Sequence, residues 1–132
     1  MKVFIADDQR ELRSALRLLI EQEREIEVVG EATEAVSMVA EVRETQPDLI
    51  LLDWELPGIE PIISPADERR LLSILRSHCP HVEIIALSGR PEAEKEALIS
   101  GARAFISKGE APHYLVSALR DIKTQSEKEK ER

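Results

Sequence analysis

The sequence predicts a doubly wound α/β domain in which one five-stranded parallel sheet lies between two layers of helices. Five short apolar runs alternate with five helix-like stretches along the 132 residues, a length that suits one domain with a real core. The runs are apolar at consecutive positions, which is typical of parallel strands covered on both faces. Strand and helix in strict alternation favour right-handed crossovers with helices on both faces of the sheet.

The first two strand and helix units follow from apolar spacing and from prolines. Residues 2–6 predict a buried strand, and 9–23 predict an amphipathic helix because leucine and isoleucine recur at helical spacing. Residues 26–30 predict the second strand, with Gly30 placed in a tight turn after it. A second helix begins near Ala35 and ends before Pro47, since the residue before a proline disfavours helical geometry.

The central units are separated by a proline-rich loop. Residues 48–53 predict the third strand, and 54–65 a loop that carries three prolines and Gly58. A third helix is expected from Pro65 to about residue 77, with its leucines facing inward. Residues 82–87 then predict the fourth strand.

The last units are bounded by proline and glycine. Pro91 suits the first turn of a fourth helix, which Gly101 ends. Residues 103–107 predict the fifth strand, and Pro112 opens the last helix. Residues 123–132 form a charged tail whose last six residues, 127–132, alternate in charge sign. We interpret the tail as a solvated helix end, with a linker to a further domain as the less favoured alternative.

Composition excludes several function classes. With 18 basic and 26 acidic residues, the net charge of −8 argues against nucleic-acid binding by this chain alone. Neither a signal peptide nor a membrane span is indicated. The single cysteine, Cys79, has no partner for an internal disulfide, which fits a reducing compartment. We therefore expect a soluble cytoplasmic domain.

Four of the apolar runs end on polar residues that together describe one site. The runs end on the pair Asp7–Asp8, on Asp53, on Ser88 and on Lys108. In open α/β sheets, ligands bind outside the carboxyl ends of the strands. Three carboxylates, a hydroxyl and an ammonium are therefore expected to converge in one crevice.

The chemistry of these groups suits a divalent cation together with a phosphoryl group. Adjacent carboxylates repel one another without a counterion, and Mg²⁺ accepts one or two carboxylates plus a phosphoryl oxygen. Asp53 can attack phosphorus and form an aspartyl-phosphate. Lys108 and Ser88 would supply a positive charge and a hydrogen bond to the phosphoryl oxygens.

Residues 2 to 122 resemble a response-regulator receiver domain of two-component signalling, especially the receivers that precede helix-turn-helix output domains. The resemblance is carried by Asp7-Asp8-Gln-Arg-Glu-Leu-Arg13, by Gly101-Ala-Arg-Ala-Phe-Ile-Ser-Lys108 and by Pro112-x-x-Leu115. It implies a flavodoxin-like (βα)5 fold and a signalling function rather than an enzyme, with slow autodephosphorylation.

The resemblance also implies a role for each site residue. Asp53 would be the phosphoacceptor, with Asp8 and, mostly through water, Asp7 holding Mg²⁺. The backbone carbonyl of Glu55 would complete the protein ligands of the metal. Ser88 and Phe105 would form a coupled switch pair, in which the hydroxyl moves toward the phosphoryl group and the ring turns inward.

Two further positions would tune the lifetime of the phosphoryl group. They lie two residues after the acceptor and two after the switch hydroxyl, and hold Glu55 and Arg90. Their opposite charges suggest that they pair across the site and screen it from water. The chain departs from the family where Leu56-Pro57 is followed by Glu60-Pro61 instead of a glycine, where this loop is longer than usual, and where Gly109 replaces a proline.

The partners implied are a histidine kinase or phosphotransfer protein and an output domain or downstream target protein, with a homodimer possible. A pseudo-receiver that binds proteins without phosphorylation is the alternative function, supported by the altered loop. A cofactor binder or small phosphatase of related topology is disfavoured because the first strand-to-helix turn lacks a glycine-rich phosphate loop.

Several simpler interpretations remain open at this point. The Asp7–Asp8 pair and Ser88 could each cap a helix. Trp54 could be an exposed partner contact or a cover over the site. Three potential metal ligands, His78, Cys79 and His81, cluster around a proline, but ligands so close in sequence at a turn have poor geometry.

Overall fold

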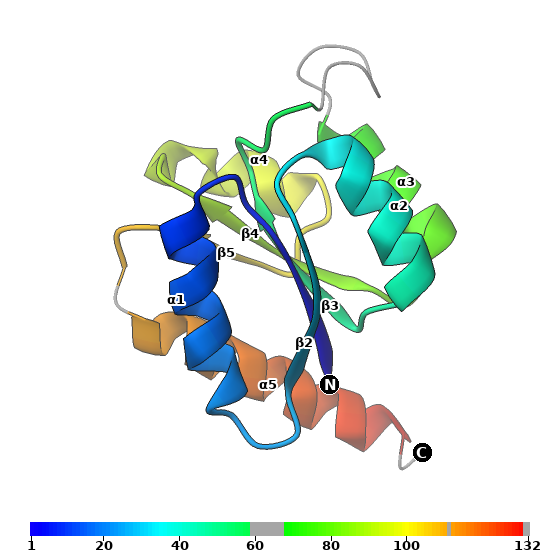
Figure 1. Cartoon of the computed structure of the whole chain (residues 1–132), viewed down its shortest axis with the longest axis vertical. Coiled ribbons are helices and arrows are strands. Elements are labelled where there is room, and N and C mark those ends of the chain that lie inside the picture. Colours follow the sequence, from blue (N-terminus) through cyan, green and yellow to red (C-terminus); the bar gives the residue numbers. More distant parts are fainter. Residues whose placement is uncertain (59–67, 111, 131–132) are drawn as a thin grey trace.

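The computed structural model describes residues 1–58, 68–110 and 112–130. Figure 1 shows a single twisted sheet with helices on both of its faces. The strands are β1 (Lys2–Ala6), β2 (Glu27–Ala32), β3 (Leu49–Asp53), β4 (Glu83–Ser88) and β5 (Ala104–Ser107). The helices are α1 (Arg10–Glu21), α2 (Ala35–Thr45), α3 (Glu68–His78), the short 3-10 helix η1 (Pro91–Ala93), α4 (Glu94–Ile99) and α5 (Pro112–Lys130).

All four strand pairings are parallel, and the strand order is β2-β1-β3-β4-β5. The direction in which the strands are added reverses between β1 and β3. The chain runs from β1 to β2 on one side of this point, and from β3 to β4 and β5 on the other. The predicted doubly wound five-stranded sheet is confirmed. In such a sheet the strand ends at the reversal form the usual binding crevice.

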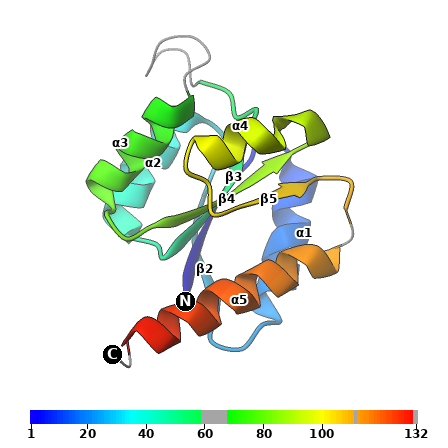
Figure 2. The same cartoon turned by 180° about the vertical axis from the view of Figure 1, so that it is seen from behind.

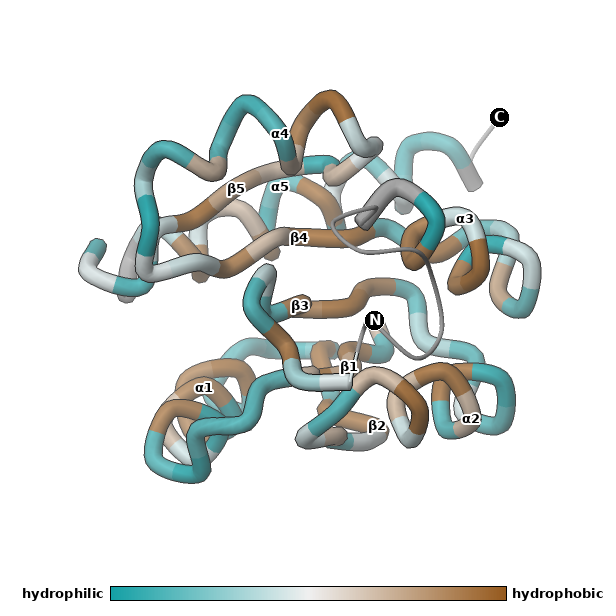
Figure 3. Tube along the Cα trace, turned by 90° about the horizontal axis from the view of Figure 1, so that it is seen from above, coloured by the Kyte–Doolittle hydropathy of each residue, from teal (hydrophilic) through white to brown (hydrophobic). Residues whose placement is uncertain are grey.

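The helices lie in two layers, one on each face of the sheet (Figures 1 and 2), and Figure 3 shows the hydropathy of these elements along the chain. Helices α1 and α5 cover one face, where Leu16, Ile20 and Leu119 pack against Ile5 and Leu51. Helices α2, α3 and α4 cover the other face. There, Met38, Leu72 and Ala97 pack against the opposite side chains of β1, β3 and β4. Every residue of β3 is buried, as expected for a central parallel strand.

The expected ends of most elements are close to the observed ones. Pro91 opens η1, which continues into α4, and Gly101 follows α4 with a positive φ of 110°. The charged segment after residue 122 continues α5 as far as Lys130. The expected start of the third helix at Pro65, the Glu60-Pro61 departure and the greater length of this loop lie outside the described residues.

The prediction of a tight turn at Gly30 is wrong. Gly30 lies inside β2, which continues to Ala32, and it pairs with Phe4 at a register shift between Val3 and Phe4. A Cβ at position 30 would lie 2.7 Å from Cε2 of Phe4. Glycine is required here because an aromatic ring lies against the backbone.

Two other interpretations are also corrected. Trp54 is only 2% exposed and belongs to the core under α2, α3 and α4, so it is not an exposed contact for a partner. The thiol of Cys79 is buried and donates a hydrogen bond to the carbonyl of Pro47. In the described part of the chain, His78, Cys79 and His81 do not form a group that could hold a metal ion. No helix among the described residues is long and apolar enough to span a membrane.

Candidate functional site

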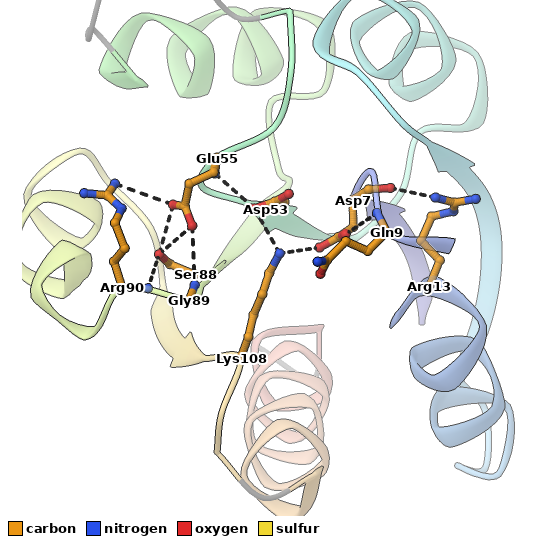
Figure 4. A network of polar contacts seen from close by, with 9 residues as sticks. All are labelled: Asp7, Gln9, Arg13, Asp53, Glu55, Ser88, Gly89, Arg90 and Lys108. Atoms are coloured by element: carbon orange, nitrogen blue, oxygen red, sulfur yellow. Dashed lines mark hydrogen bonds and ion pairs between the residues drawn. The ribbon is translucent and has the colours of Figure 1, made fainter. Parts of the chain in front are cut away.

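The carboxyl ends of four neighbouring strands bring the predicted polar residues together (Figure 4). Asp7 follows β1, Asp53 and Ser88 are the last residues of β3 and β4, and Lys108 follows β5. Lys108 continues the sheet by donating its backbone N–H to the carbonyl of Ser88 at 2.8 Å. The side chains converge because parallel strands present their carboxyl ends at one edge.

The Lys108 ammonium lies between two buried carboxylates. Its Nζ atom is 2.9 Å from Oδ2 of Asp7 and 3.2 Å from Oδ1 of Asp53. Asp7 is fully buried and Asp53 is 1% exposed, while the lysine side chain is 19% exposed. Two buried carboxylates need a counter-charge, and in this state the lysine provides it.

Backbone N–H groups fix the direction of both carboxylates. Oδ1 of Asp7 accepts a hydrogen bond from the N–H of Gln9 at 2.8 Å. Oδ1 of Asp53 accepts one from the N–H of Glu55 at 3.0 Å. Because these bonds are local, each acid is oriented by the loop that follows its own strand.

Arg13 supports this arrangement from helix α1. Its Nη1 atom donates to the backbone carbonyl of Asp7 at 2.9 Å, and its Nε atom lies 3.3 Å from Oε1 of Glu31 on β2. The arginine therefore joins α1, the loop after β1 and β2. In the sequence, Arg13 is part of the motif after Asp7–Asp8, and no role could be predicted for it there. Its position one helical turn into α1, six residues after Asp7, is the signal that was available.

Three acidic side chains offer a site for a divalent cation. One oxygen from each of Asp7, Asp8 and Asp53 lies within 4.8 Å of the other two, and this is the only such group among the described residues. Asp8 is exposed and the other two are buried. Oxygen donors with one solvent-facing member suit Mg²⁺, which keeps several waters. The residues present therefore fit the metal that the sequence predicts.

Burial dominates the protonation of the central acid. It raises the pKa of Asp53 to about 6, and the charge of Asp7 adds to this effect. The hydrogen bond from Glu55 and the charge of Lys108 act in the opposite direction. For Lys108, burial lowers the pKa, but the carboxylates of Asp7 and Asp53 outweigh burial and the net shift is upward. The lysine is therefore charged at neutral pH.

Ser88 is fully buried and its hydroxyl is already engaged. Oγ lies 2.9 Å from both carboxylate oxygens of Glu55, to which it donates, and accepts the N–H of Arg90 at 3.0 Å. The simpler interpretation of Ser88 as a helix cap is wrong, because the N-cap residues of η1 and α4 are Arg90 and Ala93 and neither helix has a side-chain cap. The bond from the N–H of Arg90 orders the turn before η1 instead. Asp7 plays a similar part before α1, where Gln9 is the N-cap residue.

The expected contact between Glu55 and Arg90 is present. Nη2 of Arg90 lies 3.6 Å from Oε2 of Glu55, and the two side chains are 52% and 38% exposed. The carboxylate also accepts the N–H of Gly89 at 3.3 Å. The contact of Gly89 with Glu55 could not be predicted from the sequence, because only the folded loop brings its N–H toward that carboxylate.

Phe105 lies on β5 opposite Ala86, two residues before Ser88 on the neighbouring strand. Its ring is partly buried and packs against the core under α2, α3 and α4. The two residues expected to form a switch are thus close in the sheet.

The sequence matches the response regulator receiver domain family over residues 3–120. A transcriptional regulatory protein of Bacillus subtilis, YhcZ, is 33% identical over 118 residues, which are 88% of this chain and 52% of that protein. The chain thus spans about half the length of this curated relative.

Solved structures agree with this match. A two-component response regulator of the LuxR family from Aurantimonas has a TM-score of 0.77 and 27% identity, covering 92% of this chain and 83% of that chain. The isolated receiver domain of RcsB from Salmonella enterica, determined with the phosphomimetic BeF3−, has a TM-score of 0.80 and 25% identity. The aligned region covers 94% of this chain and 88% of that domain.

Proposed function

The chain belongs to the response regulator receiver family, and on that premise we propose that Asp53 accepts a phosphoryl group from a histidine kinase or phosphotransfer protein. The observation that carries the proposal is the Lys108 ammonium held between Asp7 and Asp53 beside the exposed Asp8. This arrangement supplies a nucleophile, a fixed cation and an open set of oxygen donors at one strand edge.

The chemical step is a displacement at phosphorus. A carboxylate oxygen of Asp53 forms a bond to phosphorus as the phosphorus–nitrogen bond of the donor breaks, and the electron pair stays on the imidazole nitrogen. Bound Mg²⁺ would neutralise charge on the transferred phosphoryl oxygens. Asp7, Asp8 and Asp53, with the backbone carbonyl of Glu55, would hold the metal.

The remaining residues act on the phosphoryl group once it is attached. Lys108 reaches Asp53 already and would pair with a phosphoryl oxygen. Ser88 would donate its hydroxyl, and the ring of Phe105 would turn further inward as the hydroxyl moves. This coupled change would shift a two-state equilibrium at the ends of β4 and β5.

Another protein or domain would recognise the shifted conformation. An output domain, a downstream target protein or a second copy of this chain would bind the altered face. The proposal includes no direct contact with nucleic acid by this chain, in agreement with its net charge of −8. It places the signalling event in the cytoplasm.

Beryllofluoride and acetyl phosphate test the proposal. With saturating Mg²⁺, beryllofluoride should give a saturable change in the fluorescence of Trp54, and acetyl phosphate should add the mass of one phosphoryl group. Asp53→Asn should abolish both. No response to either reagent in the wild-type protein would contradict the proposal and favour a pseudo-receiver that binds proteins without phosphorylation.

A further inference from the structure

The hydroxyl of Ser88 has no free hydrogen to offer a phosphoryl group. A serine hydroxyl carries one hydrogen, and here it points to the carboxylate of Glu55, with both oxygens 2.9 Å from Oγ. One lone pair of Oγ accepts the N–H of Arg90. The side chain is fully buried, so water does not replace either partner.

The Glu55 carboxylate is held by several donors at the end of β4. Besides the Ser88 hydroxyl, it accepts the N–H of Gly89 at 3.3 Å and lies 3.6 Å from the guanidinium of Arg90 (Figure 4). A hydroxyl, a backbone N–H and a cation are donors that also suit phosphoryl oxygens. Glu55 thus occupies donors that a phosphoryl group on Asp53 would use.

We propose that Glu55 is a positioning residue that competes with the phosphoryl group for the Ser88 hydroxyl. This inference rests on the proposed function of Asp53 and adds a step to it. The phosphoryl group becomes fully bound only after the carboxylate of Glu55 has released Ser88. Glu55 therefore opposes phosphorylation and keeps the unmodified domain in one state.

The release is physically simple because Glu55 is attached at the rim of the site. Its side chain is 38% exposed, so the carboxylate can rotate into water without being buried elsewhere. Arg90 is 52% exposed and can follow it as an ion-pair partner. Two anions next to one hydroxyl repel each other. The phosphoryl group would displace the carboxylate because it is covalently attached to Asp53 and would also be held by Lys108 and by Mg²⁺ at the three acids.

The competition can be measured with beryllofluoride in the full chain. At saturating Mg²⁺, we expect Glu55→Ala to lower the apparent Kd for beryllofluoride about tenfold, which is the effect of one charge-assisted hydrogen bond. Glu55→Gln keeps an acceptor oxygen for Ser88 and should give an intermediate value. Glu92→Ala removes an exposed acid from η1, the short helix after β4, and should leave the Kd nearly unchanged, which controls for charge alone.

A double-mutant cycle separates competition for the hydroxyl from other effects. In a Ser88→Ala background there is no hydroxyl to compete for, so Glu55→Ala should then change the Kd by less than about twofold. An equal effect of Glu55→Ala in both backgrounds would overturn the inference. An unchanged Kd in the single variant would do the same while leaving the proposed function intact.

A measurement on the unmodified protein tests the contact itself. In ¹H–¹⁵N spectra, Glu55→Gln should shift the amide signals of Gly89 and Arg90, and Glu92→Gln should not. Unshifted signals would overturn the inference whatever the titration gives. If beryllofluoride binds neither wild type nor Glu55→Ala, the proposed function fails and this inference fails with it.

Discussion

The ammonium of Lys108 lies 3.2 Å from a carboxylate oxygen of Asp53, the residue that we propose as phosphoacceptor. The same ammonium contacts Asp7, so one lysine neutralises much of the charge on two buried acids. Replacing Lys108 with Met would leave these acids without their cation. We expect the free energy of unfolding to fall by about 1–3 kcal/mol in the absence of divalent metal.

Urea denaturation with and without Mg²⁺ measures this effect. Added Mg²⁺ should restore more stability to Lys108→Met than to the wild-type protein, because the metal then replaces the missing cation. Equal stabilisation of both proteins by Mg²⁺ would show that the lysine and the metal do not serve the same carboxylates.

The raised pKa of Asp53 predicts an unusual pH dependence of stability. Between the usual value of 3.8 and about 6, the native state binds more protons than the unfolded state. Without divalent metal, the contribution of Asp53 to the free energy of unfolding should therefore be largest below pH 3.8. It should decrease as the pH rises to about 6. The total loss corresponds to about 3 kcal/mol.

Comparison with Asp53→Asn isolates this contribution. The variant lacks the titrating group, so its stability relative to wild type should increase across that pH range and level off above it. Denaturation midpoints measured in a chelating buffer at several pH values test this. A difference between the two proteins that does not change with pH would contradict the assigned cause.

The contact between Gly30 and the ring of Phe4 predicts a large effect from one methyl group. Gly30→Ala would place a Cβ 2.7 Å from Cε2 of Phe4 and should cost about 1–3 kcal/mol of stability. Gly109→Ala is the matched control, because its Cβ would meet only Oγ of Ser107, at 4.0 Å. Equal denaturant midpoints for the two variants would refute the steric explanation.

The burial of Trp54 predicts its optical behaviour. At 2% exposure the indole should emit at short wavelength and be protected from quenching by iodide, although it adjoins Asp53 in sequence. Its Nε1 atom finds no hydrogen-bond partner among the described residues, which also favours emission typical of an apolar environment. Strong quenching by iodide in the native protein would show that the side chain is accessible instead.

The pairing of Glu55 with Arg90 predicts an effect on the lifetime of the phosphoryl group. Once Glu55 has released Ser88, it would stay paired with Arg90 at the solvent-exposed rim of the site, where the pair would hinder the approach of water to the aspartyl-phosphate. Arg90→Ala should therefore accelerate dephosphorylation, by about three- to tenfold if a partly exposed ion pair of about 1 kcal/mol is lost. Loss of the phosphoryl mass with time, in chelator-free buffer, gives the rate. A rate equal to that of wild type would exclude this role.

The order of strands and helices and the main polar residues of the site could be predicted from the amino-acid pattern alone. Consecutive apolar residues such as those of β3 are buried on both faces only when helices cover both sides of the sheet. The local pattern therefore predicts the layered architecture. The polar residues that follow β1, β3, β4 and β5 were predictable for a related reason. Parallel strands bring their carboxyl ends to the same edge whatever the details of the loops.

Which of these groups are in contact, and which side chains are buried, depends on how the elements pack in three dimensions. The sequence suggested a turn at Gly30, because the feature that requires a glycine there, the ring of Phe4, lies on another strand. Likewise, the burial of Trp54 depends on how α2, α3 and α4 pack together on one face of the sheet. The hydrogen bond from Ser88 to Glu55 depends on the loop after β3 lying against the end of β4, with 2.9 Å between the two oxygen atoms. No local spacing in the sequence specifies this contact. The spacing of apolar residues indicates which face of a helix or strand is buried. Contacts between loops depend instead on how these helices and strands pack against one another.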